Sequence, residues 1–172
     1  ETITKIKVNK GEDLNLFNID AHDKAAFDVI KGGNTVGVFQ LEGEGMKRSI
    51  KALVPETQED ICYLVAAYRP GPMQYISEYV AVKNGKQEPD YIFPELKPVL
   101  EITNGVITYQ DQVMKIAQIV GGYTLGAADI LRRAMGKKKM DIMEREKPKF
   151  LEGAKKQNFD EKEAERLWDK LI

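Results

Sequence analysis

Apolar side chains recur along this chain at helical spacing. Met46, Ile50 and Leu53 fall at positions i, i+4 and i+7, which lie on one face of a helix. Similar repeats follow, separated by glycine, proline and residues that favour turns. The pattern predicts helices over residues 21–31, 43–53, 59–68, 73–83, 111–120, 125–135, 140–156 and 161–171.

Two short runs carry β-branched residues without the helical repeat. They are TVGVFQ at 35–40 and GVITYQ at 105–110, and each predicts a short strand. Helical segments outnumber these runs, and no internal repeat interrupts them. The sequence therefore predicts a mainly α fold, a multi-helix domain with a few short β-strands.

Four predicted helices begin at a side chain suited to capping. Asp20, Thr124 and Asp160 each precede a helical repeat, and an oxygen at that position can accept a free backbone N–H. Thr57 stands three residues before Asp60, which resembles a capping box with aspartate in place of glutamate. We expect these residues to fix where the helices start.

The composition is that of an ordinary soluble protein. Hydrophobic residues make up 42% of the 172 positions and charged residues 31%. No run of 18 apolar residues occurs, so we expect no membrane span. The one cysteine, Cys62, excludes an internal disulfide, and its apolar helical context predicts a buried thiol in a reducing cytoplasm. Because the chain opens on Glu1, without a leader, we expect it to be part of a longer protein.

Positive charge is concentrated in one place. Residues 1–131 hold 13 basic and 18 acidic side chains, and residues 140–172 hold 8 and 9. Between them, RRAMGKKK at 132–139 holds five basic side chains and no acidic one. We call residues 132–139 the basic cluster. Long nucleic acids usually need a broadly basic face, so this local charge suits a compact polyanion better.

The basic cluster spans the predicted end of a helix at Gly136. Arg132 and Arg133 fall in the last turn, and Lys137 and Lys138 follow the glycine. One interpretation is that they complement the carbonyl end of the helix, at about 0.3–1 kcal/mol per exposed charge. The other is phosphate binding, because guanidinium groups grip phosphate oxygens bidentately and lysines add mobile charge. Five neighbouring cations repel one another without an anion, which favours phosphate.

Other chemistries fit the sequence poorly. Lys138 stands where a Walker loop needs a hydroxyl, and Leu131 stands where it needs its first glycine. His22 is the single histidine, in a context typical of a helix start, and no Asp-x-Asp pair occurs. We therefore predict no metal site and no catalytic residue within this chain.

Four long blocks resemble consecutive signature segments of one enzyme family. They resemble the alpha subunit of bacterial DNA polymerase III, the C-family replicative polymerase, over about residues 20–172. Gly43, Tyr68 and Asp111 depart mildly from the usual pattern, and only a hydroxyl contact at position 43 is affected. The blocks are GVFQLEGEGMKRSIKAL at 37–53, EDICYLVAAYRPGPM at 59–73, NGVITYQDQVMKIAQIVGGYTLGAADILRRAMGKKK at 104–139 and FLEGAKKQNFDEKEAERLWDKL at 150–171.

The resemblance implies a place within that enzyme. In the family these blocks follow the palm, which holds the catalytic aspartates, and form the fingers. Residues 1–19 are then expected to be a connecting segment from the palm. Residues 20–172 are expected to be the fingers domain, truncated at its C-terminal side. The isolated chain is expected to be inactive.

The resemblance also implies a reaction and partners. The reaction is template-directed addition of a deoxynucleotide to a primer, with Mg2+ held by the palm outside this chain. Arg132 and Arg133 would meet the incoming triphosphate, with charge added by Lys137 and Lys138. The expected partners are primer-template DNA, deoxynucleoside triphosphates and other replicase subunits, in the bacterial cytoplasm.

Two further places have both a functional and a structural interpretation. The segment YRPGP at 68–72 is either a rigid corner or a support that directs Arg69 towards the nucleotide or the DNA backbone. Tyr109, Gln110 and Gln112 either line the nucleotide pocket or satisfy backbone groups at a helix start. The alternative for the whole chain is a free-standing helical module that binds nucleic acid or a protein without catalysis.

Overall fold

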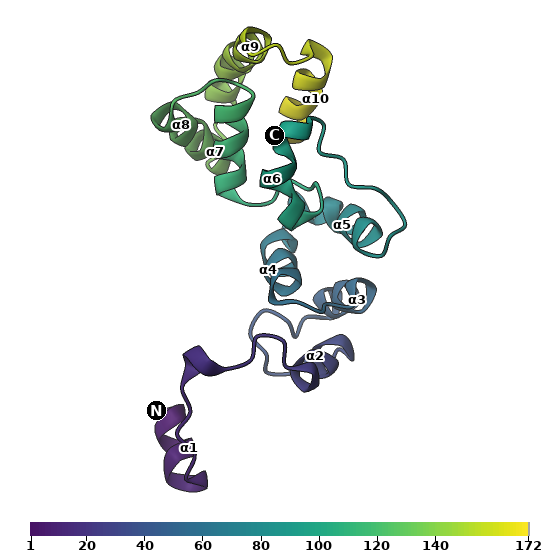
Figure 1. Cartoon of the computed structure of the whole chain (residues 1–172), viewed down its shortest axis with the longest axis vertical. Helices are drawn as coiled ribbons and strands as arrows, with labels where there is room; N and C mark the ends of the chain where they lie inside the picture. The colour runs from purple at the N-terminus through teal and green to yellow at the C-terminus, as the bar shows by residue number, and fades with distance from the viewer. Residues whose placement is uncertain (172) are drawn as a thin grey trace. The chain divides into compact units, whose positions relative to one another are not determined.

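The computed structural model describes residues 1–171, which form helices joined by turns and loops (Figure 1). Four single turns of 3-10 helix accompany the α-helices, at Leu16–Asn18, Pro72–Tyr75, Pro94–Leu96 and Glu101–Thr103. The α-helices are α1 (Thr2–Lys10), α2 (Lys24–Lys31), α3 (Glu44–Leu53), α4 (Gln58–Ala67), α5 (Ile76–Lys83), α6 (Lys97–Leu100), α7 (Gln110–Ile119), α8 (Leu125–Gly136), α9 (Met140–Lys156) and α10 (Glu161–Leu171). The mainly α prediction is confirmed.

The predicted strands are wrong, because residues 1–171 contain no strand. Residues 35–40 form consecutive tight turns, in which the Thr35 hydroxyl donates to the Leu41 carbonyl at 2.7 Å. Residues 106–108 form no regular element, and Oε1 of Gln112 accepts the N–H of Thr108 at 2.9 Å. β-Branched residues favour extended backbone, yet a strand also needs a second segment to pair with.

Most helix starts follow the sequence prediction. Thr57, Thr124 and Asp160 each accept a backbone N–H of the first helical turn, as expected. The cap of α2 was predicted one turn too early, since Asp23 and not Asp20 accepts the N–H of the first turn. Asp20 instead accepts the N–H of His22 at 2.8 Å, which closes a local turn.

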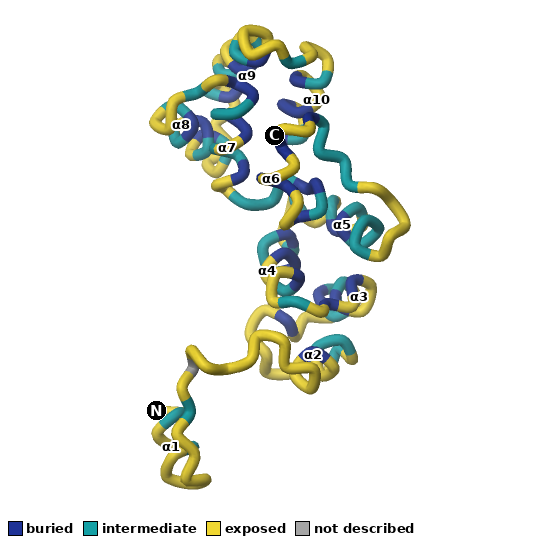
Figure 2. The backbone as a smooth tube through the Cα atoms, viewed as in Figure 1, coloured by how far each residue is buried: buried dark blue, intermediate teal, exposed yellow. Residues whose placement is uncertain are grey.

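Two further features were missed. Helix α1 lies inside the predicted connecting segment 1–19 and contains no buried residue, as Figure 2 shows. Cys62 was expected to be buried but is exposed, because its neighbours Tyr63 and Leu64 take the buried positions of α4. Helical periodicity gives buried faces reliably only where a helix has one clear apolar side.

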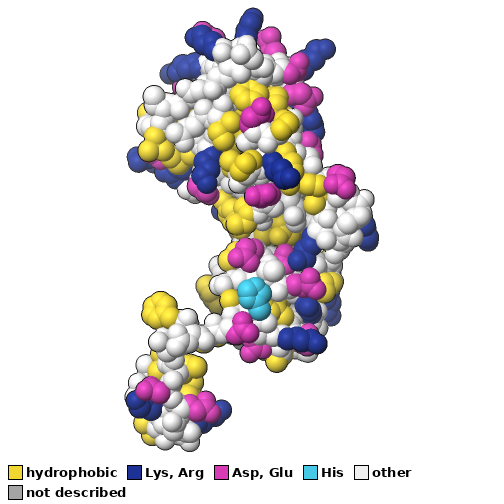
Figure 3. Space-filling model, viewed as in Figure 1, with side chains coloured by type: hydrophobic (Ala, Val, Ile, Leu, Met, Phe, Trp, Pro, Cys, Tyr) yellow, Lys and Arg dark blue, Asp and Glu magenta, His cyan; other side chains and the backbone are white. Residues whose placement is uncertain are grey.

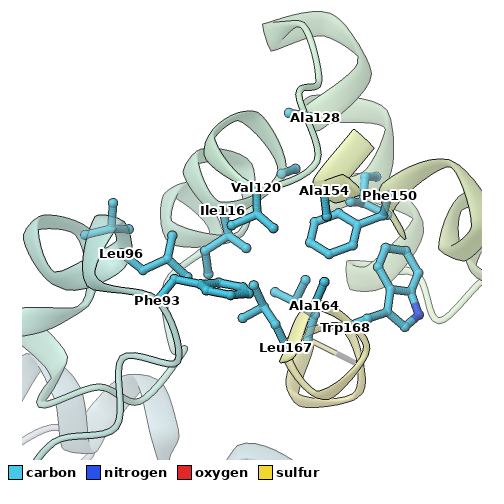
Figure 4. Close-up of a cluster of buried hydrophobic side chains, with 14 of the residues drawn as sticks. Phe93, Leu96, Ile116, Val120, Ala128, Phe150, Ala154, Ala164, Leu167 and Trp168 are labelled. Carbon is cyan, nitrogen blue, oxygen red and sulfur yellow. The ribbon is translucent and has the colours of Figure 1, made fainter. Parts of the chain in front are cut away.

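The chain divides into two compact units. The first is Glu1–Ile61, and its buried side chains include Phe27, Met46 and Ile50. The second begins at Cys62 and holds the larger hydrophobic core, drawn in Figure 4. Both units contain several helices, but only the second contains the basic cluster.

The hydrophobic core of the second unit determines which face of α8 is exposed to solvent. Ile116 of α7, Phe150 of α9 and Trp168 of α10 are at most 1% exposed, and the last two rings lie 5.2 Å apart. Leu131 and Ala134 of α8 pack into the same cluster. Burying this face leaves the opposite face of α8 at the surface, which is where the arginines project.

An ion-pair network ties the loop after α5 to α10. The Asp90 carboxylate contacts Arg166 and lies 3.1 Å from Lys170 Nζ, and it accepts the Ile92 N–H at 3.0 Å. Burial by itself would raise the pKa of Asp90, but Lys170, the Ile92 amide and Arg166 together hold it below its ordinary value.

The Asp90 network predicts a pH-dependent contribution to stability. A carboxylate with a depressed pKa stabilises the fold fully above its unfolded pKa of about 4 and loses this contribution as pH falls through its folded pKa. We expect Asp90→Asn to lower the free energy of unfolding at pH 7 by up to about 1 kcal/mol, and by less at pH 3. Chemical denaturation at both pH values checks this, with exposed Asp111→Asn as control. Equal losses at both pH values would contradict it.

Candidate functional site

Helix α8 carries the basic cluster on its exposed side. Thr124 caps its N-terminus, and the buried Leu131 fixes its rotation against the core. The helix runs through Gly136, and Lys138 then adopts a φ of 50°, in the left-handed region that favours glycine. Lys137 and Lys138 are exposed beyond the helix end. In the view of Figure 3, basic and acidic side chains are interspersed, without one broad basic face.

One carboxylate joins both arginines of the cluster. Asp129 Oδ1 accepts hydrogen bonds from Arg132 Nε at 2.9 Å and Nη2 at 2.7 Å. Asp129 Oδ2 lies 2.8 Å from Arg133 Nε. The side chains of Arg132 and Arg133 are 26% and 67% exposed, and that of Asp129 is 29% exposed. The hydrogen bond from Arg132, helped by the charge of Arg133, holds the pKa of Asp129 below its ordinary value.

Gln110 connects this arrangement to α7. Arg132 Nη1 donates to Gln110 Oε1 at 2.6 Å, across 22 residues of sequence. The structure thus brings together two residues that the sequence suggested separately. Gln110 is exposed at the start of α7, so the contact lies at the surface.

Gln112 has the structural role that the sequence left open. Its side chain is 1% exposed and accepts the N–H groups of Thr108 and Tyr109, both at 2.9 Å. Its amide nitrogen donates to the Val99 carbonyl at 3.1 Å and to the Thr103 hydroxyl at 2.7 Å. Both acceptor positions and both donors of the amide are thus engaged within the protein. Through these four contacts Gln112 positions the start of α7.

Tyr109 and Arg69 are the remaining site residues that the sequence suggested. Tyr109 is half-buried immediately before α7, and its N–H is held by Gln112. Arg69 is exposed in the corner after α4, where Gly71 has a φ of 103° that favours glycine. Among residues 1–171, no hydrogen bond or ion pair joins Arg69 to the basic cluster.

The sequence prediction missed Asp129. Its spacing to the arginines is i+3 and i+4, the two separations at which helix side chains meet. That spacing was readable from the sequence, so the signal was present.

Across the described part of the chain, no three histidine, cysteine, aspartate or glutamate side chains form a group that could hold a metal ion. None of the helices described in residues 1–171 has both the length and the apolar character needed to cross a membrane.

Comparison with known proteins shows the family to which this chain belongs. Residues 1–158 match the finger domain of the bacterial DNA polymerase III alpha subunit, and the chain belongs to this family. The resemblance inferred from the four sequence blocks is confirmed.

Individual relatives agree with the family match. The chain is 42% identical to DNA polymerase III subunit alpha of Aquifex aeolicus, over 99% of the chain and 16% of that relative. It is 44% identical to the Campylobacter jejuni protein, over 99% of the chain and 14% of the relative. It is 46% identical to the Borreliella burgdorferi protein, over 92% and 14%. The chain thus spans about one sixth or less of the length of these relatives.

Proposed function

We propose that this chain is the fingers part of a bacterial replicative DNA-directed DNA polymerase, and that its basic cluster binds the triphosphate of the incoming deoxynucleotide. The observation that carries the proposal is the paired arrangement of Arg132 and Arg133. Asp129 engages Arg132 through Nε and Nη2 and Arg133 through Nε, and Gln110 engages Nη1 of Arg132. Both guanidinium groups are thus held in place while some of their N–H donors remain for a ligand. Membership of the finger-domain family supports this assignment.

The arginine pair suits the charge that develops during nucleotide transfer. As the primer attacks the α-phosphate, negative charge grows on the leaving pyrophosphate. Guanidinium groups already held in place stabilise that charge without rearranging at the moment of reaction. Arg132 is the better fixed of the two, since Asp129 and Gln110 both hold it.

The remaining parts of the proposal concern neighbouring residues and the whole protein. Lys137 and Lys138, exposed beyond α8, add mobile positive charge around the triphosphate. Arg69 and Tyr109 remain proposed contacts to nucleotide or DNA. No step is assigned to a metal held by this chain. We place the catalytic aspartates and Mg2+ in the palm, outside it, with primer-template DNA and other replicase subunits as partners in the bacterial cytoplasm.

A titration of the chain tests the proposal. We expect dATP to bind weakly, with Kd on the order of a millimolar, because only the triphosphate is contacted. The double substitution Arg132→Ala with Arg133→Ala should abolish this binding in isothermal titration calorimetry. Arg145→Ala, which removes an exposed arginine of α9, should leave it unchanged.

A second titration with single-stranded DNA of increasing length addresses the other candidate function. Tight binding that strengthens with length, and that survives the double substitution, would favour a free-standing nucleic-acid module and contradict the nucleotide proposal. Weak binding independent of length is the expected result.

A further inference from the structure

Two side chains hold the guanidinium group of Arg132. A guanidinium group has five N–H donors, and three of them are engaged, two by Asp129 and one by Gln110. One N–H therefore remains on each terminal nitrogen of Arg132. These two donors are not used by Asp129 or Gln110, and guanidinium N–H groups are suited to phosphate oxygens.

Arg133 is held less completely. Its ion pair with Asp129 is through Nε, at 2.8 Å, and its side chain is 67% exposed. This contact fixes the inner edge of the guanidinium group while its outer end is left to solvent. Because Asp129 sits on the same helix as both arginines, its distance to each changes little when α8 moves as a rigid element.

The charge of Asp129 by itself would oppose nucleotide binding. A carboxylate beside the arginines cancels part of their positive charge and repels a triphosphate. Its presence therefore cannot be explained by attraction for the ligand. Orientation of the two guanidinium groups is the benefit that the geometry shows.

On the basis of the proposed function, we infer that Asp129 is a positioning residue, which aims Arg132 and Arg133 at the triphosphate, with Gln110 as a second hold on Arg132. The nucleotide contacts the arginines, and Asp129 acts through them. Such preorganisation assists the reacting geometry more than the first attraction of the substrate, since misplacement of a contacting group costs rate.

The test uses a full-length alpha subunit that carries this segment, with single-nucleotide incorporation on a primer-template. We expect Asp129→Asn to lower kcat about tenfold while KM for the deoxynucleotide stays constant or falls, because lost charge does not weaken attraction of an anion. Asp129→Glu should restore most of kcat, since it keeps a carboxylate on the same helix face. Gln110→Ala should lower kcat about threefold.

Glu152→Gln serves as the charge-matched control. Glu152 forms an i, i+4 pair with Lys156 on α9, at 2.7 Å, and its loss should leave kcat and KM unchanged. Unfolding midpoints of all variants identify any loss of folding, and Asp129→Glu keeps the test decisive if Asp129→Asn is unstable.

The outcomes separate this inference from the function on which it rests. If Asp129→Asn keeps the normal kcat, or raises KM alone, while Arg132→Ala impairs incorporation, the positioning role is overturned and the nucleotide site stands. If neither substitution changes incorporation, both fail. A lowered kcat that Asp129→Glu does not restore would also contradict positioning by the carboxylate.

Discussion

Replacing Arg132 with alanine in a full-length alpha subunit that carries this segment is expected to lower kcat/KM for deoxynucleotide incorporation about a hundredfold, the scale seen when one preorganised donor is removed from charge developing in a transition state. Arg132 keeps one N–H on each terminal nitrogen beyond its contacts to Asp129 and Gln110, on a helix anchored by Leu131 in the core. Affinity for primer-template should change little, because α8 presents a local cluster rather than a broadly basic surface.

Arg133→Ala should also lower kcat/KM for deoxynucleotide incorporation, but by a smaller factor than Arg132→Ala. Its side chain is more exposed, so solvent screens its charge more strongly. Pre-steady-state kinetics measures nucleotide incorporation, and a separate binding assay measures affinity for primer-template. Arg145→Ala is the control, since it removes an exposed arginine outside the basic cluster. Normal incorporation by both Arg132→Ala and Arg133→Ala would remove the basis for the nucleotide site.

Replacing Gly153 with alanine is expected to destabilise the chain by about 3 kcal/mol, at the upper end of ordinary overpacking costs. Gly153 lies in α9 where that helix crosses the chain just after α7. A Cβ at Gly153 would overlap the backbone carbonyl of Gly121. A backbone carbonyl cannot rotate out of the way as a side chain can, so α9 would have to shift. That shift would separate Phe150, which lies on α9, from the core residues that it packs against.

Gly126 supplies the matched control for that substitution. It also lies within a helix, α8, but a Cβ there meets no atom within 4 Å. Gly126→Ala should stabilise the chain by about 0.5–1 kcal/mol, because alanine loses less backbone entropy on forming a helix. Urea denaturation of both variants measures the difference. Similar stability for the two would show that the α9 crossing tolerates added volume.

Much of the helical fold could be predicted from the sequence because it depends on local chemistry. The bounds of α9 and α10 agree with the predicted ranges, and Asp160 caps α10 as expected. The prediction failed where a segment's conformation depends on distant partners. Residues 35–40 have strand-like composition but lack a neighbouring strand, and they fold into turns.

The same distinction between local chemistry and distant partners applies to the candidate site. By itself the sequence determined the cationic run, its position at a helix end and the family resemblance, since charge, capping and colinear motifs are properties of the chain order. Only the tertiary structure decided that Gln110 contacts Arg132 and that the Gln112 amide is engaged by backbone groups and the Thr103 hydroxyl. The first outcome depends on how α7 packs against α8, and the second on how α7 packs against α6 and the turn at Glu101–Thr103. Both packings are set by the shared hydrophobic core.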